Sequence, residues 1–272
     1  MTRIDQSARV DKSARIGAEV EIGPYCVVGP ETVLADGCKL VAHVHIAGRT
    51  SLGPRTTVYP FSSLGTPPQS VHYKGEASAL VIGADCVIRE NVTMNIGTTG
   101  GRMETRIGDR CMFMAGSHVA HDCIIGNEVT FANYVMLGGH CAVGDFTFFG
   151  GKAAAHQNVR IGEQVMVGGA AGCVSDVIPY SVVVGDRARL SGINVVGLRR
   201  RGVSADAIRS LWRAYRMLFF GEGLLAERLE MVAKNFAGDA HVERIVAFVR
   251  EGGKRPIATP RARTMSADGE ED

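Results

Sequence analysis

Large apolar residues recur at every sixth position over most of the chain. The series begins at Ile4, continues to Leu64 without a polar interruption, and resumes in the same phase at Ile82. It restarts one position out of phase at Ile107 and then continues to Phe149. Neither an α-helix nor an ordinary strand has a period of six, but short strands joined by bends into stacked coils do. The pattern therefore predicts a solenoid in which three six-residue units form one coil of eighteen residues.

A second column of small residues accompanies the first. It lies four positions after each large apolar residue and includes Cys26, Thr98 and Cys123. Both columns are expected to point inward, because stacked coils bury a continuous core. Glycine or alanine often follows the large apolar residue, which suits a tight bend. The predicted fold is mainly β, with a parallel β-helix over residues 1–190.

Two insertions interrupt the solenoid, one near residues 65–80 and one near residues 95–106. A regular coil wall offers few loops, so these insertions are where functional groups are expected. After the solenoid the period becomes helical, and Ser204 is placed to cap a helix. We expect a small α-helical C-terminal domain over residues 191–253. The tail over residues 254–272 contains prolines and an acidic end and is predicted to be disordered.

Composition and charge narrow the class of protein. The chain is 46% hydrophobic but only 6% aromatic, which suits a long and thin aliphatic core. The formal net charge is +2, too small to indicate binding to nucleic acid or to a membrane surface, and no apolar run is long enough to span a membrane. The repeat is entered by Ile4, so no export signal is expected. The seven cysteines form no Cys-x-x-Cys pair and are predicted to be buried and reduced in a cytoplasmic protein.

Four histidines are predicted to cluster on one corner of the solenoid. Successive coils stack about 4.8 Å apart, so residues roughly eighteen positions apart lie one above another. His121, His140 and His156 are separated by 19 and 16 positions (140 − 121 and 156 − 140), and His118 lies three residues before His121. None of the four falls in an inward column, so all are expected to point outward. An imidazole with an ordinary pKa of about 6.5 can accept a proton near neutral pH.

The segments that carry these histidines resemble one enzyme family. The sequences at 118–123 (His-Val-Ala-His-Asp-Cys), 137–140 (Leu-Gly-Gly-His) and 155–157 (Ala-His-Gln) are similar to those of the UDP-N-acetylglucosamine acyltransferases that begin lipid A synthesis. The resemblance covers nearly the whole chain. It implies a left-handed β-helix, a homotrimer, and transfer of a (3-hydroxy)acyl chain from acyl carrier protein to the 3-position of UDP-N-acetylglucosamine. The donor carries 4′-phosphopantetheine, and the enzyme itself is expected to need no cofactor and no metal.

The resemblance also implies roles for individual residues. His121 would be the general base, Asp122 would orient it, and the backbone N–H of Gly139 would stabilise the oxyanion. Cys123, in the inward column, is expected to be inaccessible, so transfer is predicted to be direct rather than through an acyl-enzyme. Gly169 would form the floor of the acyl groove, although a plain turn glycine would give the same pattern. Substrate binding is implied for Gln69, Ser70, His72, Tyr73, His118, His140, His156, Gln157 and Gly169, and uridine and phosphate contacts for Asn194, Arg200 and Arg201.

The first insertion departs from the family pattern. The family places an Asp and a Lys on the acceptor sugar, where this chain has Ser70 and His72. Loss of an ion-pairing set changes what a pocket recognises, because a buried polar group without its partner costs about 1–3 kcal/mol. The alternative hypothesis is therefore an acceptor with a 3-amino group, which would give an amide-linked acyl chain.

Two other function classes stay open at this point. Hexapeptide solenoids also host zinc carbonic anhydrases, whose histidine ligands are shared across a trimer interface, and four outward histidines are compatible with such a site. The helical C-terminal domain and the arginines at 199–201 would have no role in that enzyme. A non-catalytic scaffold is the third hypothesis.

Overall fold

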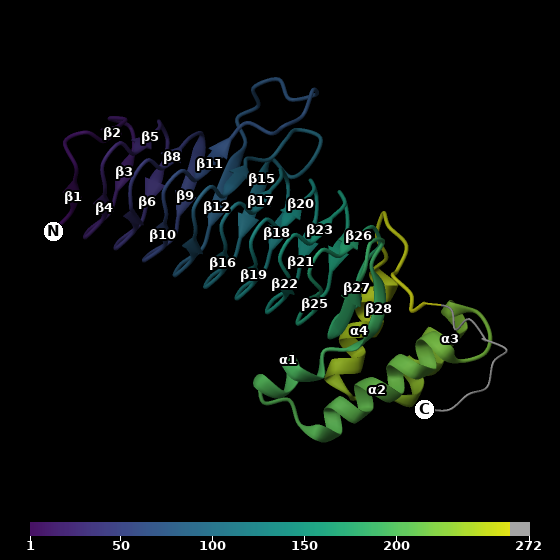
Figure 1. Ribbon diagram of the computed structural model, residues 1–272. Helices are drawn as coiled ribbons and strands as arrows, with labels where there is room; N and C mark the ends of the chain where they lie inside the picture. The colour runs from purple at the N-terminus through teal and green to yellow at the C-terminus, as the bar shows by residue number, and fades with distance from the viewer. Residues whose placement is uncertain (262–272) are drawn as a thin grey trace.

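The computed structural model describes residues 1–261, which form a long prism followed by a group of helices (Figure 1). Three sheets of eleven, nine and eight strands form the walls of the prism, and their strands are parallel except for the last strand of the first wall. Each coil contributes one strand to each wall, so neighbouring strands within a wall belong to successive coils. The predicted β-helix with C-terminal helices is therefore confirmed.

The strands are short and are ordered by coil within each wall. The first wall contains β1 (Arg3–Ile4), β4 (Glu21–Ile22), β7 (Lys39–Leu40), β10 (Thr57–Val58), β13 (Val87–Ile88), β16 (Met112–Phe113), β19 (Thr130–Phe131), β22 (Phe148–Phe149), β25 (Met166–Val167), β27 (Ser181–Val184) and β28 (Arg189–Ile193). The second wall contains β2 (Arg9–Val10), β5 (Val27–Val28), β8 (His45–Ile46), β11 (Ser63–Thr66), β14 (Thr93–Asn95), β17 (His118–Val119), β20 (Met136–Leu137), β23 (Ala154–Ala155) and β26 (Gly172–Cys173). The third wall contains β3 (Arg15–Ile16), β6 (Val33–Leu34), β9 (Arg49–Leu52), β12 (Ala79–Ile82), β15 (Glu104–Ile107), β18 (Ile124–Ile125), β21 (Ala142–Val143) and β24 (Arg160–Ile161).

The register between coils follows the six-residue period. Val119 pairs with Leu137, eighteen positions later (137 − 119). The two insertions lengthen this separation locally, so Leu52 pairs with Ile82 and Met94 pairs with Val119. The extra residues are therefore excluded from the walls and the columns stay aligned.

Both predicted columns are buried. Ile22 is 2% exposed and the small residues Cys26 and Cys123 are fully buried, and all seven cysteines are buried and free. Ile4 is 49% exposed because it lies in the first coil, where no earlier coil covers it. Thr98 contradicts the prediction, since the chain leaves the wall before it and its side chain makes polar contacts in the second insertion.

Except for Gly65 (φ 77°), the glycines that follow the large apolar residues allow neighbouring coils to approach closely and do not adopt a left-handed backbone conformation. Left-handed backbone falls two positions later, on residues such as Tyr25 (φ 56°) and His43 (φ 51°). A Cβ built at Gly23 would overlap the carbonyl oxygen of Val41 in the next coil. The spacing between coils therefore excludes a side chain at this position.

The helical region begins slightly later than predicted. β28 pairs antiparallel with β27 as far as Ile193, so the sheet continues beyond residue 191. Ser204 caps α2 as predicted, because its side chain accepts a hydrogen bond from the N–H of Ala207. The short first helix was not predicted, since six residues are too few to show a helical period. The helices are α1 (Val195–Arg200), α2 (Ala205–Phe220), α3 (Leu225–Asn235) and α4 (Ala240–Glu251).

The prediction of a disordered tail is wrong for residues 254–261. The N–H of Asp176 donates to the carbonyl of Pro256 (2.8 Å), and the N–H of Ala258 donates to the carbonyl of Asp176 (2.7 Å). Ala258 is buried. The segment pairs with backbone groups at the edge of the last coil, which composition alone does not reveal. Residues 262–272, also in the predicted tail, lie outside the described residues.

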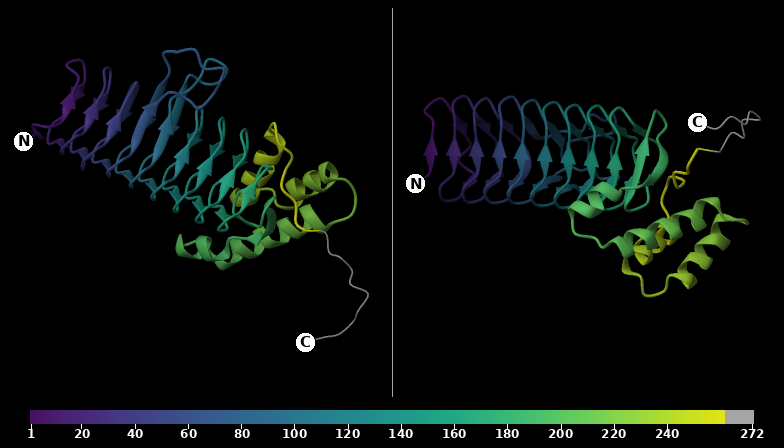
Figure 2. Two further views of the ribbon diagram at one scale, coloured as in Figure 1. Left: turned by 45° about the horizontal axis from the view of Figure 1, so that its top comes forward. Right: turned by 60° about the horizontal axis from the view of Figure 1, so that its bottom comes forward.

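The insertions and the helices lie in different parts of the prism. Figure 2 shows the helices grouped at the end away from the N-terminus, while two loops rise from one side of the prism. These loops follow β11 and β14. None of the helices in residues 1–261 is both long and apolar enough to cross a membrane.

Replacing Gly23 by alanine is expected to destabilise the solenoid by about 1–3 kcal/mol, because the new methyl group would force the next coil away. Gly100→Ala is the matched control, since a Cβ at Gly100 meets no atom within 4 Å. Thermal melting followed by circular dichroism measures the difference. Equal melting temperatures for the two variants would contradict the close-approach argument.

Candidate active site

A buried carboxylate lies at the centre of the histidine cluster. Asp122 is fully buried, and it accepts hydrogen bonds from the Thr98 hydroxyl (2.6 Å), the Thr98 N–H (3.1 Å) and the Arg102 N–H (2.7 Å). Both donor residues belong to the second insertion, which therefore wraps around the carboxylate. Burial alone raises the pKa of Asp122, but the hydrogen bonds from Thr98, His121 and Arg102 outweigh it and hold the pKa below its ordinary value. Asp122 is consequently ionised at neutral pH.

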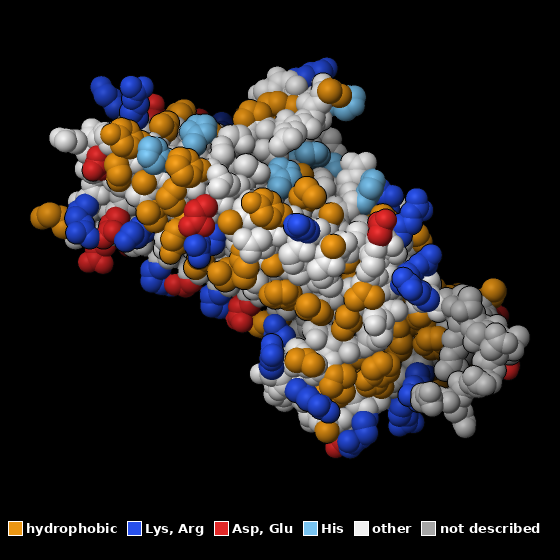
Figure 3. All heavy atoms as spheres, viewed as in Figure 1, with side chains coloured by type: hydrophobic (Ala, Val, Ile, Leu, Met, Phe, Trp, Pro, Cys, Tyr) orange, Lys and Arg blue, Asp and Glu red, His pale blue; other side chains and the backbone are white. Residues whose placement is uncertain are grey.

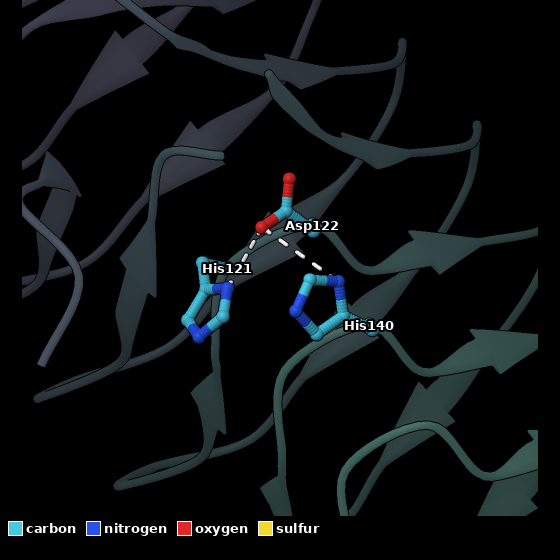
Figure 4. Close-up of side chains that lie close together, drawn as sticks. All are labelled: His121, Asp122 and His140. Carbon is cyan, nitrogen blue, oxygen red and sulfur yellow. Dashed lines mark hydrogen bonds and ion pairs between the residues drawn. The ribbon is translucent and has the colours of Figure 1, made fainter. Parts of the chain in front are cut away.

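His121 is oriented by this carboxylate. Its Nδ1 lies 2.8 Å from Oδ2 of Asp122, and its side chain is 19% exposed (Figure 4). An ionised carboxylate can only accept, so Nδ1 of His121 carries the proton. The other ring nitrogen, Nε2, is then an acceptor. This arrangement is the one required of a general base with an orienting carboxylate.

His140 belongs to the next coil and approaches the same carboxylate. Its Nδ1 lies 3.8 Å from Oδ2 of Asp122, and its ring stands perpendicular to that of His121 with centroids 4.9 Å apart. Burial lowers the pKa of His140, and the neighbouring His121 adds to that shift, although Asp122 opposes it. The structure therefore brings three predicted site residues together around one carboxylate oxygen.

Gly139 lies against the ring of His121. A Cβ built at Gly139 would lie 2.7 Å from both Cε1 and Nε2 of His121, so a side chain there would displace the imidazole. Within residues 1–261 the backbone N–H of Gly139 donates no hydrogen bond to another backbone group. Gly139 thus leaves space for the ring and offers a free N–H beside it.

These residues open into a cavity of about 440 Å³. Histidine side chains gather on this face of the molecule below the projecting loops (Figure 3). The ring of His118 is held by the preceding coil, because its Nδ1 lies 2.8 Å from the Thr93 hydroxyl. Burial lowers the pKa of His118. The structure brings six predicted residues together here, since the cavity is lined by Gln69, Asn95, His118, Ala120, His121, Gly138, Gly139, Ala155, His156 and Gln157.

Sequence reasoning missed two residues of this site. Thr98 holds the carboxylate, and Asn95 lines the cavity and fixes the start of the first insertion through Nδ2, which donates to the carbonyls of Thr66 (3.3 Å) and Pro67 (3.1 Å). The sequence pattern instead assigns Thr98 to the column of small residues, and Asn95 belongs to neither a column nor a motif, so polar residues at an insertion are the signal that could have identified them.

Asn194, Arg200 and Arg201 lie elsewhere on the chain. They line a separate cavity of about 680 Å³ on the first wall, together with apolar residues such as Phe148. Arg201 stacks on the ring of Phe146 at 5.0 Å. His121 and these three predicted substrate-binding residues therefore line two different cavities of one chain.

The remaining predicted residues do not line the histidine cavity. Ser70 and Tyr73 are partly buried within the first insertion, where the N–H of His72 donates to the Ser70 hydroxyl (3.3 Å). His72 is exposed. Gly169 follows β25 of the first wall, whereas His121 follows β17 of the second, so the two lie on different corners.

Comparison with known proteins identifies the family. A family model described as UDP N-acetylglucosamine O-acyltransferase, domain 2, matches residues 176–258, and a bacterial transferase hexapeptide model matches residues 104–139. The acyl-[acyl-carrier-protein]–UDP-N-acetylglucosamine O-acyltransferase of Azorhizobium caulinodans is 54% identical over 83% of each chain, and the protein of the same name from Methylobacterium radiotolerans is 55% identical over 75% of each chain.

A solved structure agrees with this result. The UDP-N-acetylglucosamine acyltransferase from Campylobacter jejuni superposes with a TM-score of 0.90 at 35% identity, covering 95% of this chain and 100% of that one. Matches of this kind confirm the expected fold class, a left-handed parallel β-helix with C-terminal helices. The chain therefore belongs to the UDP-N-acetylglucosamine O-acyltransferase family and is an acyltransferase.

Proposed function

We propose that the protein transfers a (3-hydroxy)acyl chain from the thioester of acyl carrier protein to the 3-hydroxyl of UDP-N-acetylglucosamine, the first step of lipid A synthesis. The names of the curated relatives support the donor and the acceptor. The observation that carries the mechanism is the hydrogen bond between His121 Nδ1 and the buried carboxylate of Asp122.

In this mechanism Nε2 of His121 accepts the proton of the sugar hydroxyl as its oxygen attacks the thioester carbon. The C–O bond forms, and the negative charge that develops on the carbonyl oxygen is stabilised by the N–H of Gly139. The C–S bond then breaks, and the leaving thiolate takes the proton from the imidazolium of His121. Asp122 stabilises that imidazolium by charge and keeps the ring in the required tautomer.

Direct transfer is favoured over a cysteine acyl-enzyme. Cys123 is fully buried, and its Sγ donates to the carbonyl of Gly138 (3.2 Å). Burial raises the pKa of Cys123 well above its ordinary value, so its thiolate is not formed at neutral pH. The nucleophile in this proposal is therefore the acceptor itself.

The two separate cavities support a site shared between copies of the chain. His121 lines one cavity, while Asn194, Arg200 and Arg201 line the other, and both groups are assigned to one acceptor. We infer that a second copy supplies the uridine and phosphate contacts to the histidine cavity, in the homotrimer that the family resemblance implies. Guanidinium groups suit the diphosphate because they donate in a planar fork.

His121→Ala is expected to lower kcat by a factor of about 10²–10⁴, because general-base catalysis contributes that much. Asp122→Asn should lose activity over a similar range, since an amide no longer fixes the tautomer of His121. His45→Ala, an imidazole on the same wall in an earlier coil, is the matched control. Mass spectrometry of the acylated sugar nucleotide measures turnover. Full activity of His121→Ala would instead support the non-catalytic scaffold.

The acceptor is tested by comparing the 3-hydroxy nucleotide sugar with its 3-amino analogue. The 3-amino alternative is motivated by Ser70 and His72, neither of which lines the histidine cavity. We expect turnover of the 3-hydroxy sugar with an ester product that mild base hydrolyses. Turnover restricted to the 3-amino sugar, with a base-stable amide, would replace our assignment.

The zinc hypothesis is tested by metal analysis of the purified protein. His121, Asp122 and His140 each offer a ligand atom within 4.8 Å of the others. The Asp122 carboxylate, however, already accepts hydrogen bonds from Thr98, Arg102 and His121, which leaves little capacity for a cation. We expect less than a tenth of a zinc ion per chain and activity that resists chelators. Stoichiometric zinc that is required for activity would favour the carbonic anhydrase class.

A further inference from the structure

The segment after α4, residues 252–260, returns to the solenoid and is here named the C-terminal strap. Its anchor is a buried ion pair, because the fully buried carboxylate of Asp176 accepts from Nε of Arg160 (2.7 Å) while the Asp176 backbone pairs with Pro256 and Ala258. A Cβ at Gly253 would lie 2.7 Å from Nε of Arg160, so the strap passes directly over this pair. Its course past the last coils can be followed in Figure 1.

The strap carries Arg255 to the histidine cavity. One terminal nitrogen of its guanidinium lies 2.5 Å from Nδ1 of His156, and its Nε donates to the carbonyl of Gln157 (3.1 Å). His156 and Gln157 both line the cavity that contains His121. Arg255 is therefore in contact with two cavity residues that lie almost one hundred positions earlier in the chain.

This contact determines which nitrogen of His156 carries the proton. A guanidinium donates and cannot accept, so Nδ1 of His156 must be the acceptor and Nε2 must carry the hydrogen. Nδ1 also lies 3.3 Å from the carbonyl of Gln157, a contact that would require a proton on Nδ1. The guanidinium contact is shorter and its donor stays protonated, so it decides the tautomer. His121 has the opposite tautomer, because its Nδ1 faces a carboxylate.

We propose that Arg255 is a positioning residue that fixes His156 as a hydrogen-bond donor in the active-site cavity. The bond would be made by Nε2–H of His156 to a carbonyl or hydroxyl oxygen of a bound substrate. This inference rests on the proposed acyl transfer. It assigns the C-terminal strap a part in substrate binding, and it divides the cavity between an accepting imidazole, His121, and a donating one, His156.

Steady-state kinetics of Arg255→Gln tests the proposal. When Arg255 no longer fixes the tautomer of His156, KM for acyl carrier protein or for the sugar nucleotide is expected to rise about tenfold, because one hydrogen bond to the substrate is lost. The kcat should stay within about twofold of the wild-type value. Arg255→Lys should recover part of the loss, because an ammonium group also only donates. Lys254→Gln is the matched control, since it removes the same charge one position earlier, from an exposed side chain.

Two further measurements separate positioning from a merely structural role. In a double-mutant cycle, Arg255→Gln should cause no additional loss once His156 is replaced by alanine. In ¹⁵N spectra of the imidazole rings, recorded without substrate, His156 should show a single Nε2–H tautomer that becomes mixed in Arg255→Gln. Thermal melting of each variant controls for detachment of the strap, and Arg255→Lys supplies the comparison if Arg255→Gln is unstable.

The proposal is overturned if Arg255→Gln behaves like Lys254→Gln, if its loss persists undiminished in the His156→Ala background, or if the His156 tautomer is unchanged. These results differ from a failure of the proposed function. In that case the wild-type protein would not acylate the sugar nucleotide at all, while the ¹⁵N spectra would still show whether Arg255 fixes the tautomer of His156.

Discussion

Parallel stacking of successive coils in register is the constraint on which the site depends. The N–H of His140 donates to the carbonyl of His121 (2.9 Å), and the N–H of Asn158 donates to that of Gly139 (2.9 Å). Each of these corner residues is therefore fixed against a residue nineteen positions away, in the neighbouring coil. The eighteen-residue repeat places Gly139 against the ring of His121 and His140 near Asp122, because backbone pairing between coils sets their distance. The corner residues of the cluster are thus held by the same backbone hydrogen bonds that build the wall.

The second insertion changes the environment of the Asp122 carboxylate at one corner of the β-helix. Without the second insertion the carboxylate of Asp122 would face solvent, where a hydrogen bond to His121 competes with water. Thr98 and the backbone of Arg102 instead enclose it and compensate its burial, so the carboxylate is both dry and ionised. A Cβ at Gly101 would collide with this carboxylate, so the insertion can close over Asp122 only with glycine at that point.

How much the sequence predicts depends on whether a feature repeats. The columns, the buried Cys123 and the clustering of His121 with His140 follow from a fixed period, and the structure confirms them. The separate position of Asn194 could not be predicted, because the period says which residues stack but not which cavity a later segment reaches. The strap was missed for a related reason. Its composition is typical of disorder, and its order comes from long-range pairing with Asp176.

The opposite tautomers of His121 and His156 show how the two parts of the chain can act on one cavity. A neutral imidazole can present either a donor or an acceptor at Nε2, and the choice is set by whatever contacts Nδ1. For His121 that contact is a carboxylate one residue away, which the second insertion holds without any contribution from the C-terminal helices. For His156 it is Arg255, whose position depends on α4 and on the ion pair between Arg160 and Asp176. A displacement of the helical region relative to the prism would leave the first imidazole unchanged and release the second. The hydrogen bond between His121 and Asp122 can therefore persist while the contact of Arg255 with His156 depends on the position of the C-terminal region.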